Sequence, residues 1–279
     1  MIRATEADRP EIEAFLAPHA PFAMFPLNNL AHYGMAGDSD YAVTCWIARR
    51  DSRITDVMTL CDNGMAMPFL PSADYAAAVA AMEDRPLMGI IGPTDQVRGV
   101  EAQGFADAPR TLDHDEPHFL LELDRMTLPD GPGLLRPLQD APPDVIKGWM
   151  LDYQLTALNT PVGEAGQMVE SSYANYVARD SHRVLMEEQT PLAMTGFNAQ
   201  LPDIVQIGGV YTPPDLRGRG YARRALALHL VEAATRGVTR ATLFSASDMA
   251  ARAYRAIGFE RIGDWTLLLF DGPQRRVVP

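Results

Sequence analysis

The stretch that decides the fold is IVQIGGVYTPPDLRGRGYA, residues 204–222. Its first nine residues are rich in β-branched and apolar side chains on both faces, which predicts a buried strand over 204–212. After a Pro213-Pro214 corner, Gly218 and Gly220 let successive backbone N–H groups converge on one point. A helical pattern follows at once, and it adds unpaired N-terminal donors and a positive dipole end. We therefore expect an anion at residues 217–222.

The spacing of the loop narrows the kind of anion. A Walker loop requires a Gly-Lys-Ser/Thr ending, and a dinucleotide fingerprint requires three spaced glycines with a downstream acid. The loop instead reads Arg-x-x-Gly-x-Ala from Arg217 to Ala222. This pattern resembles the coenzyme A loop of the GNAT N-acetyltransferase superfamily, although an Arg/Gly-rich surface turn is the alternative reading. The resemblance implies that the loop holds the pyrophosphate of acetyl-CoA, the expected co-substrate.

A second motif follows a short strand over 241–245. Ser247 or Asp248 can cap a helix that Gly258 ends, and the run from Ala250 through Tyr254 to Gly258-Phe259 resembles the last helix of the GNAT fold. The resemblance implies that the Tyr254 hydroxyl lies beside the coenzyme sulfur as the acid that protonates the departing thiolate. A phenol with a reference pKa of about 10 is protonated at neutral pH. A structural core tyrosine is the alternative.

The resemblance also implies the remaining coenzyme contacts. In the family the strand corresponding to 204–212 bulges and splays so that pantetheine lies along it. The resemblance therefore implies that Gly208-Gly209 permits this bulge. Ser247 stands where the family often has asparagine, so a hydroxyl must replace part of that contact. The implied coenzyme-binding residues are Val210, Tyr211, Thr212, Arg217, Gly218, Arg219, Gly220, Tyr221, Ala222 and Ser247.

The order of predicted elements gives the fold class. Residues 133–279 read as a strand (134–138), two helices (141–157, 165–179), a hairpin (183–187, 192–198), the strand and helix described above, a strand, a helix and two closing strands (259–262, 265–271). Residues 1–128 repeat much of this order, which suggests a duplication, but they contain no Arg-x-x-Gly-x-Ala. We expect an α+β fold with a mixed sheet: two tandem acyl-CoA N-acyltransferase (GNAT) folds, with a degenerate domain at 1–128, a linker near 128–133 and a catalytic domain at 133–279.

Composition and charge limit the class of protein. No run approaches the roughly 18 apolar residues of a membrane span, and Cys45 and Cys61 are too few for a disulfide framework and lack metal-ligand spacing. We expect a cytoplasmic protein without a metal.

Residues 204–279 carry 11 Arg and 6 Asp or Glu, whereas residues 1–203 carry 13 basic and 30 acidic side chains. The basic part suits coenzyme phosphates, with Arg217, Arg219, Arg223 and Arg224 nearest, and the acidic part would attract a cationic amine and repel nucleic acid.

These observations predict an N-acetyltransferase of the EC 2.3.1 class. The acetyl group of acetyl-CoA would pass to a primary amine of a small-molecule or peptide acceptor by direct attack in a ternary complex. The alternatives are an acyltransferase with another acyl-CoA or an amino-acid acceptor, and a non-catalytic acyl-CoA-binding sensor; a homodimer is compatible with each. The general base stays open, because Gln206 occupies the place where many relatives have glutamate, and Glu164, Glu170, Glu187 and Glu188 are equal candidates.

Overall fold

The computed structural model describes residues 1–83 and 85–277, which form two compact units. The first unit consists of Met1–Glu116 together with the chain from Gly263 onward, and the second unit is Pro117–Ile262. The sequence predicts a boundary near 128–133. The structure instead assigns 117–128 to the second unit and the chain from Gly263 to the first. The second unit is therefore inserted into the chain of the first.

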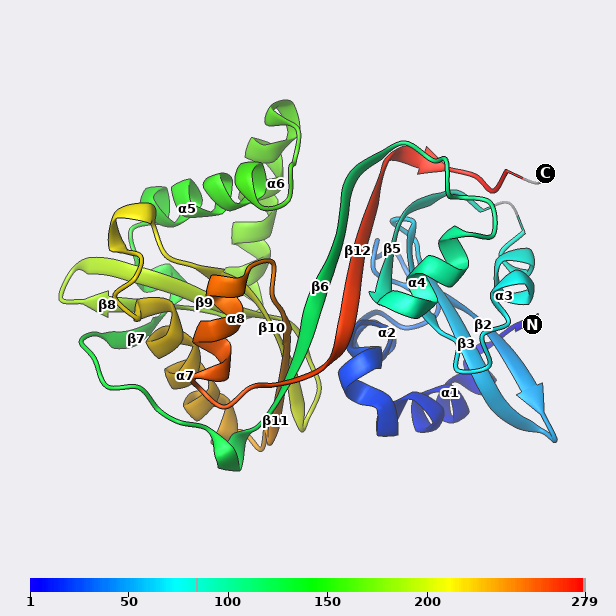
Figure 1. Ribbon diagram of the computed structural model, residues 1–279, viewed down its shortest axis with the longest axis horizontal. Helices are drawn as coiled ribbons and strands as arrows, with labels where there is room; N and C mark the ends of the chain where they lie inside the picture. Colours follow the sequence, from blue (N-terminus) through cyan, green and yellow to red (C-terminus); the bar gives the residue numbers. More distant parts are fainter. Residues whose placement is uncertain (84, 278–279) are drawn as a thin grey trace. The chain divides into compact units, whose positions relative to one another are not determined.

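The second unit is a mixed sheet with two pairs of helices. Its strands lie in the order β6-β11-β10-β9-β8-β7, and β10 runs parallel to β11 but antiparallel to β9. Its elements are β7 (Leu134–Pro137), α5 (Pro143–Thr156), α6 (Val162–Ala178), β8 (His182–Glu187), β9 (Thr190–Gln200), β10 (Ile204–Tyr211), α7 (Tyr221–Ala234), β11 (Arg240–Phe244) and α8 (Asp248–Arg255), with the end of β6 (Arg110–Glu122). Two apolar clusters cover the two faces of this sheet. One contains side chains from α5 and α6, and the other contains side chains from α7 and α8. The ribbons of these helices are labelled in Figure 1.

The first unit repeats this order of elements. Its strands lie in the order β1-β2-β3-β4-β5-β12. Its elements are β1 (Ile2–Arg3), α1 (Arg9–Leu16), α2 (Ala20–Tyr33), β2 (Val43–Arg50), β3 (Arg53–Cys61), β4 (Met65–Phe69), α3 (Tyr75–Ala81), β5 (Leu87–Pro93), α4 (Thr94–Glu101), the beginning of β6 and most of β12 (Glu260–Gln274). Strand, two helices, three strands, helix, strand, helix and strand is also the order in the second unit. The two-copy fold expected from the sequence is thus present.

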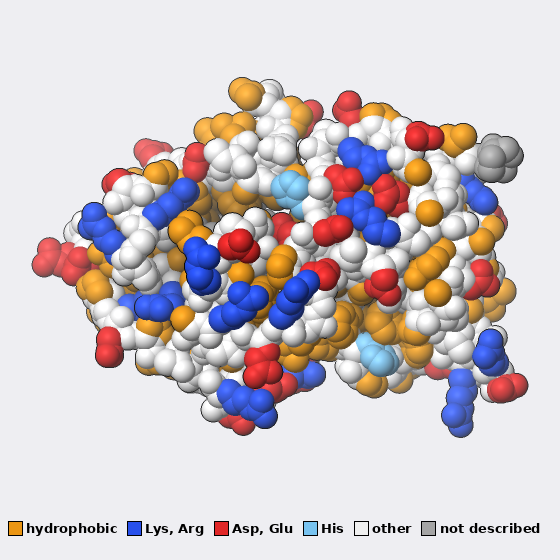
Figure 2. Space-filling view, viewed as in Figure 1, with side chains coloured by type: hydrophobic (Ala, Val, Ile, Leu, Met, Phe, Trp, Pro, Cys, Tyr) orange, Lys and Arg blue, Asp and Glu red, His pale blue; other side chains and the backbone are white. Residues whose placement is uncertain are grey.

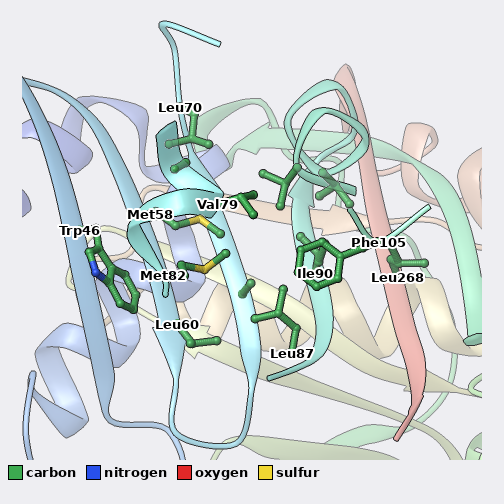
Figure 3. Close-up of a cluster of buried hydrophobic side chains, with 14 of the residues drawn as sticks. Trp46, Met58, Leu60, Leu70, Val79, Met82, Leu87, Ile90, Phe105 and Leu268 are labelled. Carbon is green, nitrogen blue, oxygen red and sulfur yellow. The ribbon is translucent and has the colours of Figure 1, made fainter. Parts of the chain in front are cut away.

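The core of the first unit depends on the end of the chain. Figure 3 shows Leu268 of β12 beside Phe105 and Ile90 among the buried side chains of this unit. Strand β12 pairs antiparallel with β5 from Trp265 to Leu269 and again at Gln274. Cys45 and Cys61 lie on β2 and β3 as buried free thiols. The last strand of the chain therefore completes the sheet of the first unit.

Two details of the sequence prediction are wrong. The two closing strands expected at 259–262 and 265–271 are one strand, β12, because the backbone runs extended through Gly263. Helix α2 was not among the elements predicted from the sequence, and it contains Pro21 and Pro26, which are local signals against a helix interior. Burial of side chains such as Leu30 overrides those signals, and a local kink at Ala23 absorbs the distortion. Within the described residues, no helix combines the length and the apolar character that crossing a bilayer requires.

Candidate functional site

A cavity of about 480 Å³ lies in the second unit, where β10 ends and the loop to α7 begins. Its volume is in the range of small-molecule and cofactor pockets. Its wall consists of Tyr153, Thr156, Ala157, Val210, Tyr211, Thr212, Leu216, Arg217, Gly218, Gly220, Tyr221, Ala222, Arg223, Ser247, Met249, Ala250, Ala253 and Tyr254. The structure thus brings together Tyr254 and nine of the ten coenzyme-binding residues named from the sequence.

The loop before α7 forms one end of the cavity. Gly218 and Gly220 have φ angles of 79° and 81°, a left-handed conformation that only glycine adopts without strain. The first intrahelical bond of α7 runs from Arg224 N to Gly220 O, so the N–H groups of the preceding turn lack helical acceptors. They open toward the cavity at the positive end of the helix dipole, and this arrangement suits a phosphate.

The arginines around the loop differ in what they can contact. The Nε of Arg217 donates a hydrogen bond of 3.0 Å to Thr212 O. Arg223 lines the cavity, and its Nε has no hydrogen-bond partner among the described residues. Arg219 is outside the wall and donates to Asp215 O. Arg224 donates instead to Pro129 O and Pro132 O, where it fixes the segment before β7. Figure 2 shows basic side chains gathered over α7 and α8, and of the four candidates Arg217 and Arg223 face the cavity.

Strand β10 opens away from its neighbours beside the cavity. It pairs with β11 only from Ile204 to Gln206, and its register with β9 shifts between Gly208 and Tyr211. Gly209 has a φ of 61° within this irregularity. Gly209 and Val210 consequently have no register partner on either neighbouring strand, and their backbone groups are available to a ligand along β10. This is the bulge expected from the Gly208-Gly209 pair.

The opposite end of the cavity is formed by α8. Ser247 is the N-cap of this helix and accepts a bond of 3.2 Å from Ala250 N. Tyr254, two turns further along α8, is half-buried, packs against the apolar cluster under α7 and α8, and contacts Phe259 edge-on. Its phenol therefore lies in the wall of the same cavity as the phosphate loop, on an element that both the cap and the core hold in place.

The sequence analysis missed Asp152. The hydroxyl of Tyr211 donates to Asp152 Oδ2 at 2.7 Å, and this bond joins the end of β10 to α5. Burial, followed by the neighbouring Asp152 carboxylate, raises the pKa of Tyr211 to about 12. The Arg217 guanidinium lies 5.9 Å from the centre of the Tyr211 ring. Tyr211 is thus a fixed part of the cavity wall, and its partner is 59 residues away in sequence, where no local signal could indicate it.

This raised pKa predicts a change of stability at high pH. The folded pKa of Tyr211 exceeds the value of about 10 in an unfolded chain. The neutral phenol therefore stabilises the fold below pH ~10, and this contribution is lost as the pH rises toward 12. We expect the free energy of unfolding to fall less between pH 10 and 12 in Tyr211→Phe than in the unmodified protein. Urea denaturation at several pH values measures this difference, and parallel curves would contradict it.

None of the carboxylates considered as general base lies in the cavity wall. Gln206 is buried, and its Nε2 donates to Ile207 O. Glu170 forms an ion pair with Lys147. Glu187 and Glu188 lie beside Arg136 at a smaller, separate cavity, and Glu164 is an exposed residue near the beginning of α6. The residues that line this cavity therefore include no carboxylate side chain.

In the first unit, protein groups fill the place of the phosphate loop. The segment between β4 and α3 corresponds in order to the segment between β10 and α7. There, Ser72 N donates to Asp56 Oδ1 at 2.8 Å, and the carboxylate of Asp74 caps α3. The Tyr75 ring packs so closely on Gly99 of α4 that an added Cβ would lie 2.3 Å from it. Carboxylates thus take the positions that an anion would need, and a ring fills the space between α3 and α4.

Residues 151–259 match the model of the family described as "Acetyltransferase (GNAT) family". These residues include the cavity wall from Tyr153 to Tyr254, and they form a GNAT domain. This part of the chain is accordingly a domain of the GNAT acetyltransferase family, whose members are acyltransferases. No curated protein matches the sequence.

Several solved structures resemble the whole chain. A tandem GNAT protein from the clavulanic acid biosynthesis pathway, solved without AcCoA, is 15% identical with a TM-score of 0.57, and the match covers 100% of this chain and 98% of that one. A GCN5-related N-acetyltransferase from Sphaerobacter thermophilus is 14% identical with a TM-score of 0.58, covering 99% and 95%. A GNAT acetyltransferase from Colwellia psychrerythraea is 14% identical with a TM-score of 0.51, covering 92% and 97%. At these identities the likeness extends to the fold alone, and that fold includes both units.

The cavity wall offers donor groups of several kinds. Among residues 1–83 and 85–277, no group of three or more His, Cys, Asp or Glu side chains is arranged to hold a metal ion. The cavity wall instead offers backbone N–H groups, guanidinium groups, hydroxyls and apolar surface. Backbone amides and arginines suit phosphates, the open strand suits an amide-containing chain, and a phenol can protonate a thiolate.

Proposed function

We propose that the protein transfers the acetyl group of acetyl-CoA to a primary amine by direct attack in a ternary complex. The observation that carries this proposal is that one cavity joins the phosphate loop to Tyr254, with the unpaired backbone of β10 between them. The pyrophosphate binds the amides of 217–222 with Arg217 and Arg223. Pantetheine lies along Val210 to Thr212, and the acetyl group lies near Tyr254 and the bulge of β10.

The reaction in this arrangement begins with the amine attacking the thioester carbonyl. The C–N bond forms, and the carbonyl oxygen becomes an oxyanion, which the backbone N–H groups of the bulge stabilise. The C–S bond then breaks, and Tyr254 donates its proton to the thiolate. The proton that the amine loses passes to water, and the Tyr254 phenolate regains a proton from solvent. Most of the rate enhancement comes from positioning and from the oxyanion donors.

The acceptor is a primary amine on a small molecule or peptide. The excess of acidic side chains in residues 1–203 favours a cationic acceptor through long-range attraction. The two free thiols suit the reducing cytoplasm, where we propose that the protein acts. A panel of amines that includes polyamines, amino sugars, amino acids and peptide N-termini, incubated with acetyl-CoA, tests the proposal through release of free CoA thiol. Amine-dependent release supports it, and binding of acetyl-CoA with no release for any amine contradicts it.

The buried Gln206 favours a second candidate function, a sensor that binds acyl-CoA without turnover. This position lacks the carboxylate that could serve as a base, and the other carboxylates considered lie outside the cavity wall. The same assay separates the two functions, because a sensor binds acetyl-CoA and releases no thiol. Propionyl-CoA and longer acyl-CoAs in parallel test the third alternative, an acyltransferase with a different acyl donor.

Replacing the proposed acid should separate catalysis from binding. In Tyr254→Phe the ring and its packing remain while the proton donor is lost, so we expect kcat to fall about 100-fold, with the affinity for acetyl-CoA nearly unchanged. Steady-state kinetics and isothermal titration calorimetry measure the two quantities. Tyr221→Phe is the matched control, because Tyr221 lines the cavity at the other end. An unaltered kcat in Tyr254→Phe would remove the acid role.

The occupied loop of the first unit leads us to propose one coenzyme site per chain. Asp56 and Asp74 would repel a pyrophosphate at the only comparable segment of that unit within the described residues. Calorimetry should give a stoichiometry of one acetyl-CoA per chain. A value of two would show that the first unit also binds the coenzyme.

A further inference from the structure

The glycine pair in β10 lies against a buried histidine. His182, the first residue of β8, is 0% exposed. In the register of the sheet it faces Gly196 of β9, which in turn faces Gly208 of β10. An ideal Cβ on Gly196 would lie 2.1 Å from His182 Nε2, and one on Gly209 would lie 2.9 Å from it. The two glycines therefore form a notch through which the imidazole crosses β9 and reaches the bulge of β10.

The rest of the imidazole is held firmly. The ring stacks on Tyr176 of α6 with a centroid distance of 3.6 Å and an interplanar angle of 14°. Nδ1 is 2.9 Å from the hydroxyl of Ser181. Burial, with smaller contributions from Arg179 and Arg183, lowers the pKa of His182 to about 3, so the ring is neutral at physiological pH. One face, one nitrogen and the charge state of this side chain are thus fixed.

The second nitrogen has no partner among residues 1–83 and 85–277. Nε2 is buried without a hydrogen bond to any described residue, and this is the atom that points at Gly209. A buried polar atom without a partner is uncommon and calls for an explanation. A hydrocarbon ring would fill the notch without this cost, so packing alone does not account for an imidazole here.

The atoms opposite Nε2 belong to the strand that should bind the thioester. Gly209 is left-handed, and both Gly209 and Val210 lack register partners. The orientation of their backbone N–H groups therefore depends on the side chain that lies against the bulge, which is His182. We propose that His182 is a positioning residue: its Nε2 takes a backbone group of the bulge as partner when the thioester binds, and so directs the bulge N–H groups at the thioester carbonyl. This inference rests on the proposed function, since it assigns a role in aligning acetyl-CoA.

The inference predicts a loss of carbonyl polarisation without a loss of coenzyme binding. Infrared difference spectra with acetyl-CoA labelled with ¹³C at the carbonyl report this polarisation directly, and no acceptor is needed. On the unmodified protein the carbonyl stretch should move to lower frequency. In His182→Ala most of this movement should disappear, while the dissociation constant of CoA, which has no acetyl carbonyl, stays the same. With an active amine, kcat should fall about 100-fold, the size expected for a reacting group displaced by about 1 Å.

Two further variants distinguish a positioning role of His182 from a general loss of structure. Gly196→Ala leaves His182 in the chain but places a methyl group where Nε2 lies, so it should give the same infrared and kinetic result. His229→Leu is the matched control. His229 is another fully buried histidine of this unit, stacked on Phe197 at 3.8 Å, and its replacement should alter the thermal midpoint but leave the carbonyl shift unchanged.

The possible results are distinguishable. If the unmodified protein does not bind acetyl-CoA, the proposed function fails. If it binds with a shifted carbonyl and both His182→Ala and Gly196→Ala keep that shift, the positioning role is refuted although the function stands. A proportional loss of CoA affinity and of kcat in both variants would also refute it, because this is the result of a merely structural role. Loss of the shift with CoA binding intact supports the inference.

Discussion

Gly220→Val should weaken acetyl-CoA binding about 100-fold, which corresponds to ~3 kcal/mol. Gly220 is the N-cap of α7 with a φ of 81°, and a β-branched residue in this left-handed conformation costs roughly 1–2 kcal/mol. The nearest atom to an added Cβ, Arg223 Nη2, is 3.5 Å away, so the effect comes from the backbone conformation and not from a clash. The loop relaxes to another conformation, and the N–H groups no longer converge.

The control for this prediction is Gly237→Val. Gly237 follows α7 with a φ of 97° and is outside the cavity wall. An added Cβ there would lie 4.0 Å from its nearest neighbour, Pro202 O. Its replacement carries a comparable backbone strain at the other end of the same helix. Calorimetric titration with CoA should therefore give unchanged affinity for Gly237→Val. Equal affinity in the two variants would show that the loop does not hold the coenzyme.

A fragment that begins at residue 133 should not fold, whereas a fragment spanning 117–262 should. The segment 118–122 of β6 pairs with all of β11, from Arg240 to Phe244. Phe119 and Leu121 are fully buried in the apolar cluster under α7 and α8. Burying a side chain of either type contributes roughly 1.5–3 kcal/mol. Loss of both removes a large part of the 5–15 kcal/mol that stabilises an ordinary domain.

Circular dichroism melting of the two fragments tests this expectation. The longer fragment should melt cooperatively, and the shorter one should show no cooperative transition. In the intact chain, Phe119→Ala should lower the free energy of unfolding by about 3–5 kcal/mol. A folded 133–262 fragment with the same midpoint as 117–262 would contradict the assignment of β6 to the second unit.

The features predicted correctly from the sequence are those with local causes. The φ angles of Gly218 and Gly220, the Ser247 cap and the helix that carries Tyr254 each follow from a few neighbouring residues. The resemblance of these motifs to a known family then fixed the order of the remaining elements of the second unit. Local signals of this kind identify a binding loop even without its surroundings.

The missed features depend on distant residues. The bond between Asp152 and Tyr211 and the contact between His182 and Gly209 exist only because the sheet brings separate segments together. The unit boundaries have the same cause, since strand pairing decides which unit receives β6 and β12. Single-sequence patterns contain no information on which strand pairs with a segment more than a hundred residues away.

The insertion of the second unit into the first has a consequence for biosynthesis. During translation the catalytic unit is complete once residue 262 has left the ribosome, whereas the first unit still lacks Leu268 and Phe270 of its core. A nascent chain that stops in this interval carries a folded acetyltransferase unit and, on β5, an unpaired apolar strand edge of the kind that chaperones and proteases recognise. Translation of β12 then closes the first sheet, because this strand pairs with the free edge of β5.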